Sequence, residues 1–105
     1  MDNDVVIKTW ASDASGDATV DFTGHKGKRI NWVKTIPDAG VSSYNLTLTD
    51  EDDFDWLIGE GSSRSTTDSE IIFASSLIIL PNDTMTFVIA GAGNVQTGTI
   101  KISVH

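Results

Sequence analysis

Apolar and polar residues alternate with a period of two along most of the chain. Leu46 and Leu48 share one side of their segment, whereas Asn45 and Thr47 take the other. This period is typical of β-strands that are buried on one face. The same pattern occurs at 5–7, 18–22, 30–32, 44–49, 85–89 and 100–104. Two runs, 71–73 and 77–80, are apolar at consecutive positions, which favours strands covered on both faces or lying at an interface. About eight short strands are therefore expected.

Turn-forming residues separate these segments. The connections 11–17, 23–27 and 37–43 are rich in Gly, Asp and Ser, and Gly91 to Asn94 is expected to turn the last hairpin. The longest polar stretch runs from Gly59 to Glu70. There is no helical periodicity, internal repeat or linker. We predict an all-β, single-domain antiparallel β-sandwich over residues 1–105, either jelly-roll or Ig-like in topology.

Charge and composition narrow the classes of partner. The chain has 15 acidic and 7 basic residues, for a net charge of −8, and no cysteine. Nucleic-acid binding and anionic membranes both require cationic surfaces, so neither is expected as a partner. A disulfide framework and a thiolate metal site are excluded. The N-terminal residues lack the pattern of a secretory signal, so we expect a soluble protein made in the cytoplasm.

The acidic run 50–55 contains five carboxylates in six residues. Clustered carboxylates are the ligands that Ca²⁺ prefers. The EF-hand pattern fails, however, because Asp55 occupies the position of its glycine and Gly61 that of its last glutamate. We interpret the run as a solvated turn and expect no metal or other cofactor; the alternative is a calcium site that is not of the EF-hand type.

A basic run lies at His25 to Arg29, where Lys26, Lys28 and Arg29 provide three of the seven basic residues. Such a short run is typical of a solvated loop. Alternatively it holds a phosphate, contacts the carboxylates of a partner, or pairs with the acidic run of a neighbouring copy.

Candidates for catalysis are few. His25 and the terminal His105 are the two histidines, too few for a zinc site without cysteine. His25 lies in a glycine-containing turn between polar residues, a poor position for the buried imidazole of a catalytic triad. No phosphate-binding or dinucleotide-binding fingerprint occurs. We expect no catalytic residue and a protein that is not an enzyme.

The aromatic residues divide into two groups. Phe22, Trp32 and Phe87 lie in phase with the apolar side of their strands, which predicts core positions. Trp10 ends a predicted strand, and Phe54 and Trp56 follow the acidic run. Aromatic residues at such places are enriched in protein interfaces, although each could also fold over the core.

The stretch Tyr44 to Asp52 (YNLTLTDED) resembles a strand and turn found in small virion-associated proteins of tailed bacteriophages and prophages. In that group the turn is followed by a hydrophobic pair, glycines and an arginine, which here correspond to Trp56-Leu57, Gly59, Gly61 and Arg64. Residues 92–100 resemble the closing hairpin of the group. The chain departs from the pattern at Asp53, where the group has a turn glycine, and at Ser63, where it has an asparagine.

The resemblance implies a structural component of a tailed-phage virion, made in the host cytoplasm. The expected role is a capsid decoration, or cement, protein that binds the outer shell. Alternatives are a tail or head-to-tail accessory protein that adapts fibres, and a carbohydrate-binding β-sandwich using Trp10 or Trp56. Expected partners are phage capsid or tail proteins and further copies of this chain, as a trimer or dimer. The candidate interface residues are Trp10, Lys26, Lys28, Arg29, Phe54, Trp56 and Arg64.

Overall fold

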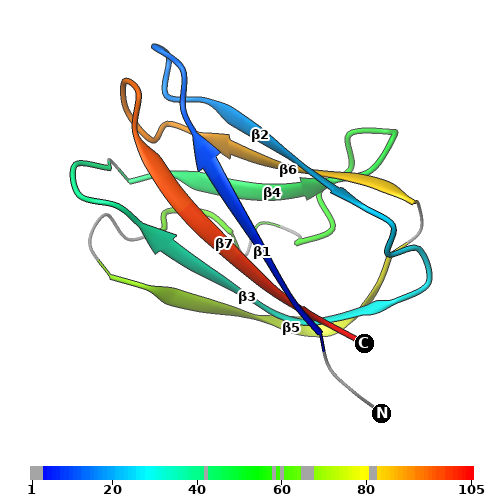
Figure 1. Ribbon diagram of the computed structural model, residues 1–105. Helices are drawn as coiled ribbons and strands as arrows, with labels where there is room; N and C mark the ends of the chain where they lie inside the picture. The colour runs from blue at the N-terminus through cyan, green and yellow to red at the C-terminus, as the bar shows by residue number, and fades with distance from the viewer. Residues whose placement is uncertain (1–3, 42, 58, 60, 65–67, 81–82) are drawn as a thin grey trace.

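The computed structural model describes residues 4–41, 43–57, 59, 61–64, 68–80 and 83–105. Within these residues the chain forms seven β-strands (Figure 1). They are β1 (Asp4–Ala11), β2 (Ala18–Thr23), β3 (Arg29–Pro37), β4 (Asn45–Thr49), β5 (Glu70–Ile79), β6 (Thr84–Ala90) and β7 (Thr97–Val104). No helix of the described residues is long and apolar enough to cross a membrane.

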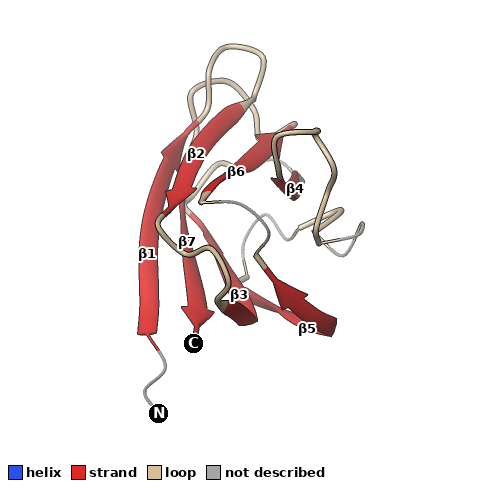
Figure 2. Cartoon of the chain, turned by 90° about the vertical axis from the view of Figure 1, so that its right-hand side faces the viewer, coloured by secondary structure: helices blue, strands red, loops and turns tan. Residues whose placement is uncertain are grey.

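The strands form two sheets that pack face to face (Figure 2). One sheet has the order β1-β7-β3-β5 and the other β2-β6-β4, and every described pairing is antiparallel. This arrangement confirms the predicted antiparallel β-sandwich.

The path of the chain distinguishes the two predicted topologies. Each strand lies in the opposite sheet from the strand before it, so all connections between the described strands cross the sandwich. In an Ig domain the first two strands share a sheet, whereas β1 and β2 here do not. The alternation between sheets is that of a jelly roll.

Two expectations about connectivity were wrong. The apolar residues 71–73 and 77–79 belong to one strand, β5, and Leu80 follows its end, so the described chain has seven strands where about eight were expected. Residues 91–94 do not turn a hairpin, because β6 and β7 lie in different sheets. They form an arch whose Ala92 donates its N–H to the Gly16 carbonyl in the β1–β2 loop, at 2.9 Å.

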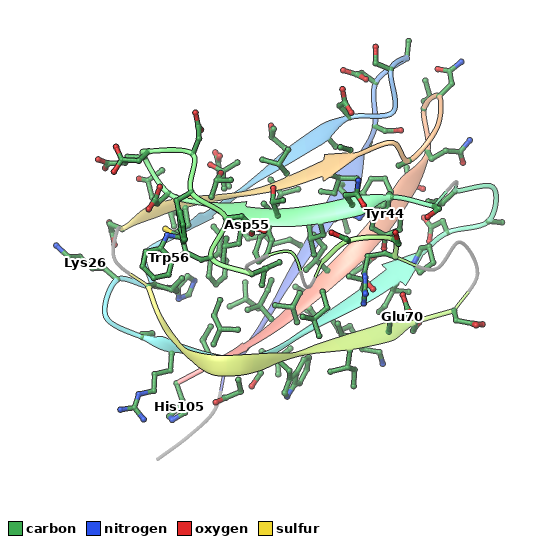
Figure 3. All side chains as sticks on the ribbon, turned by 180° about the vertical axis from the view of Figure 1, so that it is seen from behind. Lys26, Tyr44, Asp55, Trp56, Glu70 and His105 are labelled. Carbon is green, nitrogen blue, oxygen red and sulfur yellow. The ribbon has the colours of Figure 1, made fainter. Side chains whose placement is uncertain are left out.

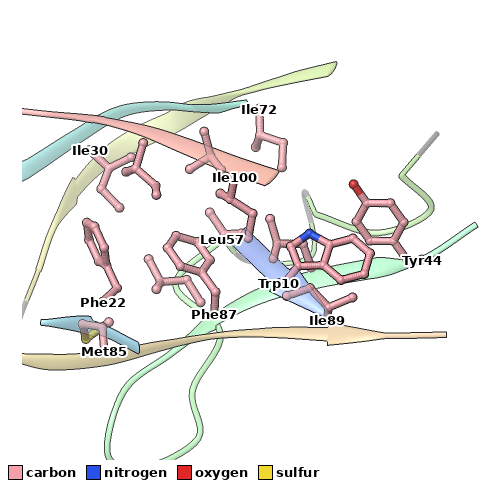
Figure 4. Close-up of a cluster of buried hydrophobic side chains, with 14 of the residues drawn as sticks. Trp10, Phe22, Ile30, Tyr44, Leu57, Ile72, Met85, Phe87, Ile89 and Ile100 are labelled. Carbon is pink, nitrogen blue, oxygen red and sulfur yellow. The ribbon is translucent and has the colours of Figure 1, made fainter. Parts of the chain in front are cut away.

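The core lies between the two sheets (Figure 4). The predicted alternation is confirmed in β4, β6 and β7, where every second residue is buried, and Ser103 near the end of β7 is buried as well. Phe22 and Phe87 are fully buried, and their rings meet edge to face at 5.4 Å. Burying side chains of this size contributes about 1.5–3 kcal/mol each, which is the main stabilisation of a domain without disulfides.

Trp10 belongs to this core. Its side chain is only 3% exposed and lies 5.5 Å from the Tyr44 ring. Gly98, which pairs with Trp10 across β1 and β7, leaves room for the indole, because a Cβ at Gly98 would overlap the ring. Trp10 is therefore a core residue and not an interface residue, because its side chain is not available to a partner at the surface.

A β-bulge in β3 changes which residues face the core. The pairing of β3 with both neighbours shifts between Ile30 and Trp32. An extra residue reverses the alternation beyond it. Val33 and Thr35 therefore point inward with Ile30, and Trp32 lies on the outer side of the sheet. The prediction that Trp32 is a core residue was wrong for this reason.

Candidate protein-contact surfaces

The acidic run forms a turn that is fixed by two of its own carboxylates. Asp50 accepts hydrogen bonds from the backbone N–H of Asp52 at 2.8 Å and of Phe54 at 3.1 Å, and from the Trp56 indole N–H at 2.8 Å. The hydrogen bond from Trp56 is the largest cause of a lowered pKa at Asp50, and the two backbone donors act in the same direction. We call residues 50–55 the acidic turn.

Asp55 has a similar structural role at the end of the acidic turn. It accepts hydrogen bonds from the N–H groups of Leu48 at 3.1 Å, Leu57 at 2.9 Å and Gly59 at 3.0 Å. Within the part of the chain that the structure describes, no three His, Asp or Glu side chains gather as metal ligands. The sequence indicated a cluster of carboxylates. In the structure two of them, Asp50 and Asp55, accept hydrogen bonds from backbone N–H groups and so fix the turn.

Phe54 is the exposed apolar group of the acidic turn. Its side chain is 53% exposed, and its ring meets the Trp56 ring edge to face at 5.5 Å. Trp56 is partly buried against the core, and its N–H is occupied by Asp50. Trp56 therefore acts as a support for Phe54, which is the more accessible of the two rings.

Residues 61–64 run back along β4. The Leu46 N–H bonds to the Gly61 carbonyl at 2.8 Å, and the Arg64 N–H bonds to the Tyr44 carbonyl at 2.7 Å. The Arg64 guanidinium bonds to the Ser62 carbonyl and lies 3.7 Å from a Glu70 carboxylate oxygen. Arg64 thus joins its own segment to β5. The pKa of the neighbouring Tyr44 hydroxyl is raised, and burial of the side chain is the largest cause.

The basic run forms an ordered turn at the other end of β4 from Arg64. We call residues 25–29 the basic turn. Its backbone is fixed, since the Gly27 N–H donates a hydrogen bond to the Leu80 carbonyl at 2.9 Å and the Arg29 N–H donates one to the His105 carbonyl at 2.8 Å. His25 stacks on Phe22 at 4.5 Å, while Lys26, Lys28 and Arg29 are exposed. Figure 3 shows Lys26 and Trp56 at one end of the sandwich and Glu70 at the other.

The outer side of the four-stranded sheet carries a surface that the sequence analysis did not identify. The register places Ile7, Lys101, Lys34 and Ile71 in one row, with one residue from each strand. Their neighbours Val33, Ile72, Ile100 and Ile102 are buried, so the row faces outward. We call this surface the lysine face; it comprises Val5, Ile7, Trp32, Lys34, Ile36, Ile71 and Lys101.

Part of the signal for this surface was present in the sequence. Lys101 lies between the core residues Ile100 and Ile102, which places it on the outer side of β7, whereas Lys34 is in phase with Ile30 and faces outward only because of the bulge. Their juxtaposition required the pairing of β3 with β7, strands that are distant in sequence. The outward position of Trp32 required the bulge.

Comparison with known proteins gives a structural similarity. No protein-family model matches the chain. No curated protein matches it. Among solved structures, the chain is similar to a chain of the cyanophage Pam1 capsid asymmetric unit, with 17% sequence identity and a TM-score of 0.43. The similarity covers 93% of this chain and 81% of that chain.

Proposed function

We propose that this protein is a non-enzymatic structural component of a tailed-phage virion that decorates the outer surface of the capsid shell. The proposal rests on the resemblance of residues 44–64 to small virion-associated proteins. In this chain the described residues of that stretch form one hydrogen-bonded unit, in which the acidic turn and the returning segment 61–64 both bond to β4. The unit presents an exposed aromatic ring on a fixed backbone, which suits contact with another protein.

The basic turn is the surface we assign to the shell. It concentrates three exposed cationic side chains on a molecule whose net charge is −8. Its backbone is held by hydrogen bonds to Leu80 and His105, so little conformational entropy is lost when a partner binds. A shell surface with carboxylates at the junction between capsid subunits is the complementary partner.

Binding by such a small surface is weak for one copy. Decoration becomes stable when many copies bind a repeated shell and also contact one another. A copy already bound to the shell is held close to its neighbour, so the contact between copies forms at a high effective concentration. A small sandwich with charged turns at one end, and with an outer face that mixes lysines and apolar side chains, is suited to making both kinds of contact.

The carbohydrate-binding alternative has less support. A sugar platform needs an accessible aromatic face, and Trp10 is buried in the core. Trp56 is partly buried and covered on one side by Phe54. The tail-accessory alternative uses the same surfaces as decoration, and the location of the protein on the particle separates the two.

The test is an add-back experiment. Particles assembled without this chain are mixed with purified protein, and the bound copies are located by image reconstruction. We expect density repeated across the shell. Density confined to a ring of about six or twelve copies at the tail would replace decoration with the accessory role, and no density on the particle would overturn a virion role.

The assignment of the basic turn is tested with charge-reversal variants. Lys26→Glu/Lys28→Glu is expected to lower shell occupancy at least tenfold, since two attractive contacts become repulsive. The control is Val95→Ser, which alters an exposed side chain on the β6–β7 arch and is expected to bind normally. Normal occupancy by the charge-reversed protein would overturn the assignment.

A further inference from the structure

Exposed apolar side chains are concentrated on two surfaces. Five large hydrophobic residues of the described chain are strongly exposed. Val5, Ile7 and Ile71, which are 50%, 60% and 47% exposed, belong to the lysine face. A fourth, Phe54, projects from the acidic turn. Contiguous exposed apolar groups that are mixed with charge mark sites of protein association.

The lysine face contains an electrostatic conflict. Lys34 and Lys101 lie directly opposite each other on adjacent central strands. Like charges at such a pair of positions destabilise a sheet. Among the described residues neither lysine forms an ion pair with a carboxylate, and apolar residues flank them on both sides. An anionic group placed over the pair would relieve the repulsion.

The acidic turn offers the complementary chemistry. Asp50 and Asp55 are engaged in holding the turn, which leaves Glu51, Asp52 and Asp53 as exposed carboxylates beside the Phe54 ring. The acidic turn presents one apolar ring flanked by carboxylates, and the lysine face presents two ammonium groups flanked by apolar side chains. The two surfaces are therefore complementary in charge and polarity. Because the turn is fixed by hydrogen bonds, it can dock without first becoming ordered.

We propose that the lysine face binds the acidic turn of a second copy of this chain. In this contact Phe54 packs on the apolar side chains of the face, and the carboxylates of Glu51, Asp52 and Asp53 lie over Lys34 and Lys101. The attraction relieves the lysine repulsion of one copy and buries the most exposed ring of the other.

The contact joins different surfaces on the two copies. The lysine face lies on the outside of the β1-β7-β3-β5 sheet, whereas the acidic turn follows β4 of the other sheet (Figure 2). A contact of this kind leaves one free face and one free turn in a dimer, so it continues into a ring or an open chain. A turn on a face buries less than a standard interface, and the expected Kd is about 0.01–1 mM.

Two variants with complementary defects test the proposal. The face variant is Lys34→Glu/Lys101→Glu, and the turn variant is Glu51→Gln/Asp52→Asn/Phe54→Ser, which places no cation on the turn that could attract the reversed face. Sedimentation velocity at protein concentrations of about 0.1–1 mM should show that each variant alone is monomeric. A mixture of the two should give a dimer and nothing larger, because one intact face and one intact turn remain. The unchanged protein should form species beyond the dimer.

NMR spectroscopy supplies a second measurement. When the unlabelled turn variant is added to the labelled face variant, shifts in amide resonances should be confined to residues near 50–55. The same labelled spectrum shows whether the face variant is folded. A mixture that stays monomeric, or single variants that associate as the unchanged protein does, would overturn the proposal.

The matched control separates this contact from the proposed shell contact. Lys26→Glu/Lys28→Glu makes the same change in charge at the basic turn and should self-associate normally while losing shell binding. The self-association proposal concerns contacts between copies and does not depend on the virion role. Loss of both properties in the control would contradict the assignment of separate surfaces.

Discussion

Three residues other than glycine adopt a left-handed backbone among those described. They are Asp53, Ser63 and Val95, with φ of 60°, 54° and 48°. Asp53 and Ser63 are also the two positions at which the chain departs from the phage-protein pattern, where that pattern has glycine and asparagine. These are the residue types that tolerate left-handed φ best. Asp53 and Ser63 therefore hold a backbone conformation that glycine or asparagine would adopt at a lower energy.

Replacing Asp53 by glycine should stabilise the protein. Left-handed φ costs roughly 1–2 kcal/mol for a residue with a Cβ, and glycine gives back about 0.5–1 kcal/mol in unfolded-state entropy. We expect Asp53→Gly to raise the free energy of unfolding by up to about 1 kcal/mol, because aspartate tolerates left-handed φ better than most residues with a Cβ. The control Asp52→Gly, at a neighbouring residue without left-handed φ, should lower it. Urea denaturation measures both, and a loss of stability in both variants would contradict the argument.

Asp50 links the acidic turn to pH. Its pKa is lowered first by the hydrogen bond from the Trp56 indole N–H. A carboxyl whose folded pKa lies below its unfolded value stabilises the fold above the unfolded value, near 3.9 for aspartate. That contribution disappears as pH falls through the lowered folded pKa.

Asp50→Asn should therefore be less stable than the unchanged protein at neutral pH, and the difference should shrink below about pH 4. Chemical denaturation at a series of pH values measures this convergence. The control Asp52→Asn removes a carboxylate from the same turn but keeps the acceptor of the three hydrogen bonds. A constant difference between Asp50→Asn and the unchanged protein at all pH values would contradict the proposed coupling.

At the scale of the strands, alternation predicted where strands lie but not which side each one buries. The core of β4, β6 and β7 follows directly from period-two patterns, because each has a single apolar side. In β1 the apolar residues Val5 and Ile7 face outward, and Trp10 supplies the core contact. A local pattern cannot identify the buried side when both sides contain apolar residues.

Long-range pairing explains the remaining differences. The bulge between Ile30 and Trp32 is seen in the pairing of β3 with both β5 and β7, and it moves Trp32 to the outer side of the sheet. The single polar residue Asn31 at this point does not by itself indicate a bulge. The sheet that the chain enters after residues 91–94 is likewise set by packing across the sandwich, since the turn residues themselves are compatible with a hairpin. The candidate acidic and basic turns were found from sequence because clustered charge is local. The lysine face was not, because its two lysines come from different strands.

The opposite positions of two tryptophans give a test at this scale. Trp10→Ala should lower the free energy of unfolding by about 3–5 kcal/mol, the usual cost of truncating a buried aromatic residue. Trp32→Ala removes a ring on the outer side of the sheet and should cost about 1 kcal/mol. Urea denaturation gives both values. In addition, acrylamide should quench the fluorescence of Trp32 more than that of Trp10; similar losses and similar quenching would contradict the bulge.

At the scale of the whole molecule, two electrostatic effects oppose each other. Every copy carries a net charge of −8, so copies repel each other at long range. The proposed contact brings three carboxylates over two lysines at short range. Salt screens the long-range repulsion first, because the Debye length falls from about 30 Å at 0.01 M to about 8 Å at 0.15 M. Contacts that are partly buried are screened much less.

Self-association should therefore be strongest at an intermediate salt concentration. Raising sodium chloride from about 0.01 to 0.15 M should strengthen association several-fold, and about 1 M, where the Debye length is about 3 Å, should weaken it again. Sedimentation equilibrium at the three salt concentrations measures this directly. A contact made of apolar groups alone would strengthen steadily with salt, because only the net repulsion would change. A contact dominated by opposite charges would weaken steadily, so the shape of the curve distinguishes the mixed surface of lysines and apolar side chains from either simpler interface.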